Sequence, residues 1–234
     1  VHEAVQIERE MSGTPVQMIW SREEDMRRGR HRPMAAIRFK VGFDLEKNVT
    51  AFANHSVTHS IMQSANPAVV KGGIDPSSIE GLADMQYQFP NLAVSHTMKQ
   101  THLTTWWWRS VGSSQNAFAL ECFIDELATA AKCDPFGFGR AHPVARPDLA
   151  EVLSALKEHS GWHDKLPAGS ARGMALHESF GTICGTVAEV SITGPGKLSV
   201  DRVISVVDCG NLVNPQTAEM QVETGVVYGL SAAL

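Results

Sequence analysis

The chain has 234 residues, which is enough for one large domain or two small ones. Its 43% hydrophobic and 19% charged residues are typical of an ordinary globular protein. The net charge of −5 excludes a protein whose overall charge favours nucleic acid. The four cysteines form no CxxC pair, so we expect free thiols, and no apolar run approaches membrane-spanning length.

The chain begins at Val1, without Met and already in a helical pattern, and it stops at Leu234 with no helix-stop signal. We therefore expect an internal piece of a longer polypeptide, which leaves the compartment open between cytoplasm and periplasm of a bacterium. Apolar spacing predicts a helix over 2–12, and 15–20 is predicted to be a strand. Ser21, followed by three acidic residues, is expected to cap a short helix.

A basic run over 27–32 has two interpretations, which the sequence leaves open. It is either a solvated loop or the border of an anionic cofactor or a subunit interface. Alternating apolar residues then predict a hairpin of strands 35–43 and 49–58. His55 and His59 have a spacing that suits a metal only on a helix, and no third ligand is evident, so a metal site is the weaker hypothesis. Another strand is predicted over 92–101.

Three consecutive tryptophans precede Arg109, and they cannot all face one core. We expect at least one of them to line a pocket or an interface. A guanidinium beside aromatic walls can hold an anionic or carbonyl-bearing ligand, although it can equally stack on a tryptophan to close a loop. Gly112 is expected to allow a sharp turn, and Ser113 or Ser114 to cap an amphipathic helix over 114–132.

The rest of that helix is predicted to bury its apolar residues on one face, namely Phe118, Leu120, Cys122, Phe123 and Leu127. A Gly- and Pro-rich stretch over 134–147 indicates a connector. A helix over 148–160 and strands over 173–176, 183–192 and 198–207 are expected to follow.

The closing stretch carries the most pronounced local pattern. A buried strand over 203–207 is expected to end in a turn over 208–211, after which Asn214 is the N-cap and Pro215 the first residue of a helix. A strand, a tight turn and a capped helix present free backbone N–H groups, which together form an anion-binding site. Cys209 lies in the turn, but no base accompanies it, so it is interpreted as a packing residue.

Other chemistries lack their motifs, because GxxxxGK[ST], GxGxxG, GxSxG and HExxH are all absent. Three stretches together resemble a known family. WRSVGSSQNAFALECFIDELA (108–128) and VDCGNLVNPQTAEMQVETGVVYGL (207–230) resemble two segments of the xanthine dehydrogenase/aldehyde oxidase family. VQMIWSREEDMRRGRHRP (16–33) is similar to a stretch of its isoquinoline 1-oxidoreductase-type large subunits, also called beta subunits.

The resemblance implies part of a molybdenum hydroxylase large subunit with an α+β fold of mixed β-sheets and packed helices. Such an enzyme binds molybdopterin cytosine dinucleotide and hydroxylates an N-heteroaromatic compound or an aldehyde, with water as the oxygen source. A separate small subunit with 2Fe-2S clusters is the expected partner, and a cytochrome is one possible electron acceptor. We expect a first molybdopterin-binding region over 1–133, a connector with one helix over 134–171 and a second region over 172–234 that is truncated at its C-terminus.

The resemblance also assigns site residues. Arg109 matches the family's substrate-pocket arginine, and Trp107 and Trp108 are the expected pocket wall. The residues expected to bind the cofactor are Gly112, Ser113, Ser114, Gln115, Asp208, Gly210, Asn214 and Gln221. No residue is assigned as a metal ligand.

Two departures from the family pattern limit these assignments. Thr224-Gly225 stands where the family usually shows Gly-Gly, so a close helix contact is expected to be wider. The family's Gly-rich loop would precede Val1 and its catalytic glutamate would follow Leu234, so the piece alone is expected to be inactive. The rival hypothesis is a non-catalytic binding or assembly module on a degenerate form of the same fold.

Overall fold

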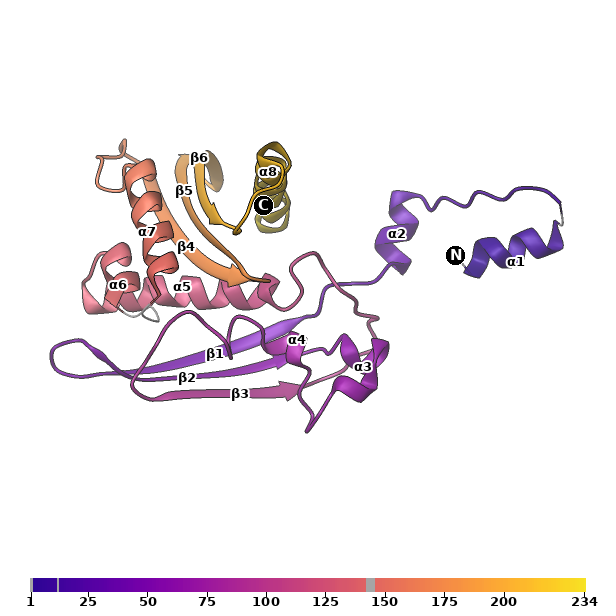
Figure 1. Cartoon of the computed structure of the whole chain (residues 1–234), viewed down its shortest axis with the longest axis horizontal. Coiled ribbons are helices and arrows are strands. Elements are labelled where there is room, and N and C mark those ends of the chain that lie inside the picture. Colours follow the sequence, from indigo (N-terminus) through magenta and orange to yellow (C-terminus); the bar gives the residue numbers. More distant parts are fainter. Residues whose placement is uncertain (1, 12, 142–145) are drawn as a thin grey trace.

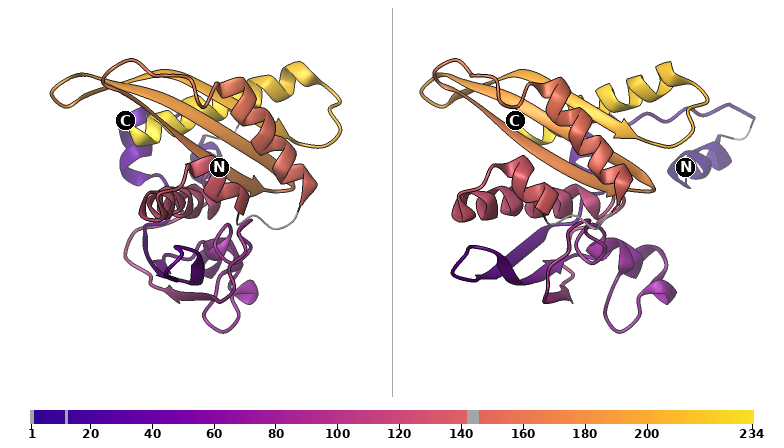
Figure 2. Two further views of the ribbon diagram at one scale, coloured as in Figure 1. Left: turned by 90° about the vertical axis from the view of Figure 1, so that its left-hand side faces the viewer. Right: turned by 60° about the vertical axis from the view of Figure 1, so that its left-hand side comes forward.

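The computed structural model describes residues 2–11, 13–141 and 146–234. The fold contains two three-stranded sheets, and the long helix α5 (Ser113–Ala131) lies between them (Figure 1). The two further views keep this layered arrangement (Figure 2). The fold is therefore α+β with mixed sheets and packed helices, as predicted.

The first sheet contains the predicted hairpin. Strand β1 (Ala35–Phe43) pairs antiparallel with β2 (Val49–Thr58), and both bounds are those expected from the sequence. Strand β3 (Leu92–Met98) lies parallel to β2. The connection between these parallel strands contains α3 (Met62–Ala65), the 3-10 turn η1 (Pro67–Val69) and α4 (Pro76–Ile79).

The core between the first sheet and α5 is rich in aromatic rings. Phe39 stacks on Phe123 with ring centroids 4.6 Å apart, and Phe52 stacks on Phe89 at 4.5 Å. Leu120 of α5 is fully buried against them. The predicted apolar face of the helix is therefore right in part, but it is rotated. Phe118 is 71% exposed and Cys122 is also exposed, because α5 packs through Leu120, Ile124, Leu127, Ala128 and Ala131.

The second sheet is an antiparallel meander of β4 (Ser170–Ser179), β5 (Thr182–Gly194) and β6 (Lys197–Asp208). Helix α7 (Pro147–Ser160) packs on one face through Leu149, Val152, Leu153 and Leu156, as its sequence predicts. Helix α8 (Pro215–Ala233) lies on the other side of the sheet (Figure 1). The strand over 203–207 is only half-buried, so the prediction of a fully buried strand is wrong.

The predicted connector over 134–147 is wrong for its first half. Helix α6 (Pro135–Ala141) occupies it, with Phe136 and Phe138 buried. The Asp134 carboxylate accepts the Gly137 N–H at 3.1 Å, and Pro135 has a fixed backbone angle suited to the first turn of a helix. Burial of the two phenylalanines outweighs the low helix propensity of the intervening glycine. Residues 142–145 of the predicted connector lie outside the described residues.

The N-terminal part lies apart from both sheets in Figure 1. It contains α1 (His2–Glu10) and α2 (Arg22–Arg28), and neither helix buries a residue. The Ser21 cap is confirmed, because its hydroxyl accepts the Glu24 N–H at 3.2 Å. The predicted strand over 15–20 is wrong, since these residues pair with no strand of the described chain. An apolar pattern alone cannot supply the partner that a strand needs.

All four cysteines are free thiols, as expected. Across the ranges that the structure describes, no helix has the length and apolar character needed to cross a membrane.

Candidate functional site

The tryptophan stretch is held in place by the basic run. His31 and Thr105 form a parallel bridge, in which the His31 N–H donates to the Thr104 carbonyl and the Trp106 N–H donates to the His31 carbonyl, each at 3.0 Å. This pairing places alternate residues of the two segments side by side. The Arg30 guanidinium lies 3.9 Å from the Trp106 ring centroid, and that of Arg32 lies 4.7 Å from the Trp108 centroid.

These contacts answer part of the question that the sequence left open. Trp106 and Trp108 are half-buried under the two arginines, whereas Trp107 is 40% exposed and meets Trp106 edge to face. Arg30 and Arg32 are exposed, but each is fixed over a tryptophan ring, and the N–H groups at the edge of each guanidinium have no part in that stacking. The arginines that stack on tryptophan come from the basic run, and Arg109 has a different partner.

Arg109 reaches helix α8. Its guanidinium donates a hydrogen bond to the side-chain oxygen of Gln221. The neighbouring Trp108 ring meets the Tyr228 ring with centroids 4.8 Å apart. Two residues that were predicted from motifs 112 positions apart are thus in direct contact. Tyr228 was not predicted as a site residue.

Gly112 is required for close approach of two backbones. A Cβ at this position would lie 1.9 Å from the Ser77 carbonyl oxygen, so any side chain would collide. Its φ of −68° is open to all residues, so the expected sharp turn is not the reason for glycine here. The left-handed residue is Val111, with φ of 50°. The predicted serine cap is wrong, because Gly112 is the N-cap and α5 has no side-chain cap.

A carboxylate already faces the start of α5. Glu80 accepts the Gly112 N–H at 3.3 Å, and burial raises the pKa of Glu80, with the charges of Asp84 and Asp75 acting in the same direction. The side-chain amide of Asn116 donates to the Ser78 and Glu80 carbonyls, which ties this loop to the helix. The helix start is thus occupied in part by a side chain of the protein itself.

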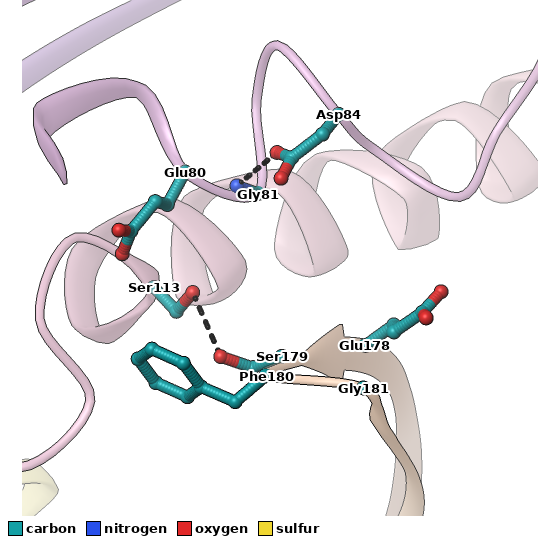
Figure 3. A pocket seen from close by; sticks show the side chains of 8 residues that line it. All are labelled: Glu80, Gly81, Asp84, Ser113, Glu178, Ser179, Phe180 and Gly181. Atoms are coloured by element: carbon teal, nitrogen blue, oxygen red, sulfur yellow. Dashed lines mark hydrogen bonds between the residues drawn. The ribbon is translucent and has the colours of Figure 1, made fainter. Parts of the chain in front are cut away.

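Figure 3 shows the pocket beside this helix start, which has a volume of about 340 Å³. Glu80, Asp84 and Glu178 contribute carboxylates, while Ser113 and Ser179 face each other with their hydroxyls 3.5 Å apart. Glu178 also pairs with Arg146. A pocket with this charge repels anions, so the expectation that the α5 start faces an anion does not apply to this side of the helix.

On the same turn of α5, Gln115 has an unfilled hydrogen-bond acceptor. Its side-chain oxygen is buried and has no partner among the described residues. Ser114 is half-buried and shares a hydrogen bond with Ser110 at 2.5 Å. A buried acceptor without a donor is costly, and it is a feature that a bound ligand with N–H groups would satisfy.

The closing motif folds locally as its sequence predicts. The Asp208 carboxylate accepts the Gly210 N–H at 3.0 Å, and Gly210 has a left-handed φ of 71°. The Asn214 side chain accepts the Thr217 N–H at 3.1 Å, and its carbonyl accepts the Ala218 N–H. Pro215 has no N–H to offer. In the first turn of α8, the free backbone donor is therefore the N–H of Gln216, which has no partner in the described chain. The motif therefore offers fewer free donors than the sequence suggested.

An apolar groove separates α8 from the second sheet. Val203, Ser205 and Val207 of β6 face Val222 and Val226 of α8 across it, and Gln221 lies at its edge. No residue of α8 is buried. Thr224 is exposed, and its hydroxyl donates to the Met220 carbonyl of its own helix.

Glu121 is a buried group for which sequence analysis proposed no role. Its carboxylate accepts from the Leu176 N–H at 2.6 Å and from the Tyr87 hydroxyl and Gln86 amide, each at 3.1 Å. Burial raises the pKa of Glu121 to about 8. Glu121 therefore joins α5 to the loop of the first sheet and to β4 of the second. The sequence does hold a signal for this burial. Glu121 precedes the apolar Ile124 by three residues and Ala128 by seven, and these spacings place all three on one face of a helix.

The histidine pair does not converge. His55 lies on the exposed face of β2 with Nδ1 2.8 Å from the Ser95 hydroxyl, whereas His59 is buried beyond the end of that strand. In 2–11, 13–141 and 146–234, no group of three or more His, Cys, Asp or Glu residues is placed to hold a metal ion.

The predicted site residues thus fall into three groups. Arg109, Trp108 and Gln221 meet at α8. Gly112, Ser113, Ser114 and Gln115 form the start of α5, and Asp208, Gly210 and Asn214 form the turn before α8. Trp107 is exposed beside the first group.

Two protein-family models match this chain, and both describe the same kind of domain. One model of a molybdopterin cofactor-binding domain matches residues 5–141, and a second model with the same description matches residues 88–234. Both matches include α5, the helix between the two sheets.

Curated relatives agree with the family models. The chain is 28% identical over 230 residues to the beta subunit of isoquinoline 1-oxidoreductase of Brevundimonas diminuta, covering 95% of this chain and 29% of that protein. It is 26% identical over 251 residues to a membrane-bound aldehyde dehydrogenase (pyrroloquinoline-quinone) of Gluconacetobacter polyoxogenes, covering 96% and 32%. The nicotinate dehydrogenase B-type subunit of Pseudomonas putida is 30% identical over 146 residues, covering 55% and 12%. The chain therefore spans about a third or less of the length of these relatives.

Among solved structures, quinoline 2-oxidoreductase from Pseudomonas putida 86 aligns with a TM-score of 0.50 at 18% identity, covering 79% of this chain and 25% of that one. At this identity the likeness concerns the fold alone. The two family models each match more than half of the chain, and the chain belongs to the molybdopterin cofactor-binding domain family.

Proposed function

We propose that the chain is part of the large subunit of a molybdenum hydroxylase. The enzyme binds molybdopterin cytosine dinucleotide and hydroxylates an N-heteroaromatic compound or an aldehyde, with water as the oxygen source. The observation that carries this proposal is the contact of Arg109 with Gln221. Family membership supplies the cofactor class, and this contact joins the expected substrate-pocket arginine to the expected cofactor-contacting glutamine.

The residues present fit a polar, partly anionic cofactor. Arg109 is exposed and has further N–H donors beyond the one given to Gln221. The buried oxygen of Gln115 offers an acceptor that a pterin N–H can use, and Gln216 offers a backbone donor at the start of α8. Gly210 keeps the backbone of the turn before α8 free of a side chain. The acidic pocket of Glu80, Asp84 and Glu178 is excluded as the site of the dinucleotide phosphates.

When bound, molybdopterin supplies the redox-active metal and lowers the pKa of the water that is the oxygen source. This chain supplies binding and orientation. Arg109 is the group proposed to hold the polar end of the substrate, and its hydrogen bond to Gln221 fixes the direction of the guanidinium. Trp107 and Trp108 are proposed as the apolar wall, which favours a flat substrate.

The proposed partners are a small subunit that carries 2Fe-2S clusters and, beyond it, an electron acceptor such as a cytochrome. Two relatives are named as individual subunits of an oxidoreductase and a dehydrogenase, which supports a multi-subunit enzyme. The names of the relatives include both N-heterocycle and aldehyde oxidation, so both substrate classes belong in the test.

The test uses the complete large subunit produced together with its second subunit. We expect about one molybdenum per large subunit, release of cytidine nucleotide on acid treatment, and dye reduction with a quinoline-type compound or an aldehyde. Replacing Arg109 with Lys is expected to lower kcat/KM by about tenfold or more while molybdenum content stays unchanged, because a lysine ammonium lacks the planar set of donors that lets Arg109 bond Gln221 and still offer N–H groups to a substrate.

Glu126→Gln is the matched control, since Glu126 is exposed on the far part of α5. A complete, folded complex without molybdenum or pterin would overturn the proposal and favour a non-catalytic assembly module. Molybdenum with a guanine or mononucleotide form of the pterin would retain the hydroxylase and correct the cofactor.

A further inference from the structure

The contacts around Trp108 form a continuous series across three segments of the chain. Arg32 lies over the Trp108 ring at 4.7 Å, and Tyr228 meets the same ring at 4.8 Å with planes tilted by 46°. The series therefore runs from the segment before β1, through the tryptophan stretch, to α8. Arg30 forms a parallel contact with Trp106, but that contact does not reach α8.

Tyr228 and Gln221 lie on the same face of α8, because seven residues correspond to two helical turns. Trp108 and Arg109 are neighbours in the chain and contact these two residues in turn. The pair of contacts therefore fixes both the position and the direction of the 108–109 peptide relative to the helix.

This arrangement matters because α8 has little else to hold it. None of its residues is buried, and an apolar groove separates it from the second sheet. Arg109 is itself exposed, and a free arginine side chain has many rotamers to lose when it binds a ligand. A ring contact next to the arginine reduces that freedom before any ligand arrives.

We infer that Arg32 and Tyr228 are positioning residues for the proposed substrate-binding arginine. They contact the Trp108 ring and thereby keep Arg109 directed at Gln221. The inference rests on the proposed function for the role of Arg109, but the contacts themselves are independent of it. Neither Arg32 nor Tyr228 is assigned to touch substrate or cofactor.

The test has an arm that needs no activity. Hydrogen–deuterium exchange of the complete enzyme is followed in peptides covering 104–112 and, for comparison, 120–130. Tyr228→Leu is expected to speed exchange over 104–112 by about fivefold or more and to leave 120–130 unchanged. Tyr228→Phe retains the ring and is expected to exchange as the wild type does. Arg32→Met is expected to act in the same direction as Tyr228→Leu, with a smaller change of about twofold.

The kinetic arm separates positioning from general damage. Tyr228→Leu is expected to lower kcat/KM by about tenfold at unchanged molybdenum content, and Tyr228→Phe to restore it to within twofold. In an Arg109→Lys background, Tyr228→Leu is expected to cause less than a twofold further loss, because the group that it positions is already gone. Fully multiplicative losses would overturn the inference.

Two controls are matched to these variants. Arg30→Met removes the equivalent arginine–tryptophan contact at Trp106, and Val227→Ala changes an exposed neighbour of Tyr228 on α8. Both are expected to leave exchange over 104–112 and kcat/KM at the wild-type values. If Arg30→Met acts as strongly as Arg32→Met, the series through Trp108 has no special role and the inference is wrong. An enzyme without molybdenum would defeat the proposed function, while the exchange arm would still decide the inference.

Discussion

Helices α5 and α8 have the same length of 19 residues, and each contains most of one of the two longer family-like stretches, yet they are held in opposite ways. Eight residues of α5 are buried, whereas α8 buries none. Conversely, α8 has a side-chain cap from Asn214 and α5 has none. Helix α5 is fixed by what packs around it, and α8 is defined by its own sequence.

This difference between α5 and α8 indicates that one helix mainly stabilises the fold and the other mainly serves the site. Helix α5 packs against the first sheet and carries Glu121, which bonds to β4 of the second, so changes within it act on the fold. Helix α8 buries no residue, and its Gln221 and Tyr228 contact Arg109 and Trp108, so changes there are expected to act on the site. The following experiments test that division.

The largest effect is expected from Leu120→Ala in α5. Leu120 is fully buried among the aromatic rings of the first sheet, so the change creates a cavity and is expected to lower the free energy of unfolding by about 3 kcal/mol. Leu230→Ala in α8, where the leucine is only half-buried, is expected to cost less than about 1 kcal/mol. Urea denaturation measures both. Equal losses would show that α8 is as firmly packed as α5.

Glycine replacements make the same comparison through the backbone. Gly112→Ala places a Cβ 1.9 Å from the Ser77 carbonyl oxygen, and the backbone must move, so a loss of about 2 kcal/mol is expected. A Cβ at Gly225 of α8 meets nothing within 4 Å, and Gly225→Ala is expected to stabilise that helix by about 0.5 kcal/mol or slightly more. Thermal unfolding should show a lower midpoint for Gly112→Ala and an unchanged midpoint for Gly225→Ala, because α8 buries no residue and its stability is local.

The next test uses pH. The pKa of Glu121 is raised by burial from 4.5 to about 8, so between these pH values the folded chain holds a proton that the unfolded chain has lost. Stability from this group therefore falls as the pH rises from 5 to 8, by about 1 kcal/mol per pH unit. In Glu121→Gln, the free energy of unfolding measured by urea denaturation is expected to change less with pH between pH 5 and 8.

Neighbouring acids must be separated from this effect. Burial raises the pKa of Asp125 to about 6, and the pKa of Glu80 is also raised, so some slope below pH 6 is expected to persist in the Gln variant. Glu223→Gln on the exposed surface of α8 serves as the comparison and should leave the profile unchanged. An unaltered slope between pH 6 and 8 in Glu121→Gln would contradict the assignment.

The smallest effect is expected at the cap of α8. Asn214→Ala removes the hydrogen bond to the Thr217 N–H, which is a local loss of about 1 kcal/mol. Because α8 buries no residue, the helix start should fray without unfolding the sheets. Amide exchange over 216–220 should become about fivefold faster while the urea midpoint stays within error. A shift of the midpoint would mean that α8 is coupled to the core.

The sequence by itself determined those features that depend on neighbours in the chain. The hairpin 35–43/49–58 follows from alternating apolar residues, and α7 from Pro147 and its apolar spacing. The caps at Ser21 and Asn214 follow from a side-chain oxygen placed three residues before a free N–H.

Only the tertiary structure decided features that depend on distant partners. The stretch 15–20 has no strand to pair with in the described part of the chain, and α6 forms because Phe136 and Phe138 are buried in a core. Carboxylates from two separate segments, the loop over 80–84 and β4, make the pocket beside α5 acidic, which no local pattern reveals. Burial and cavity charge are both set by residues that are far apart in the chain. The same is true of the hydrogen bond between Arg109 and Gln221, because a local sequence pattern can identify each residue but cannot predict its contact partner.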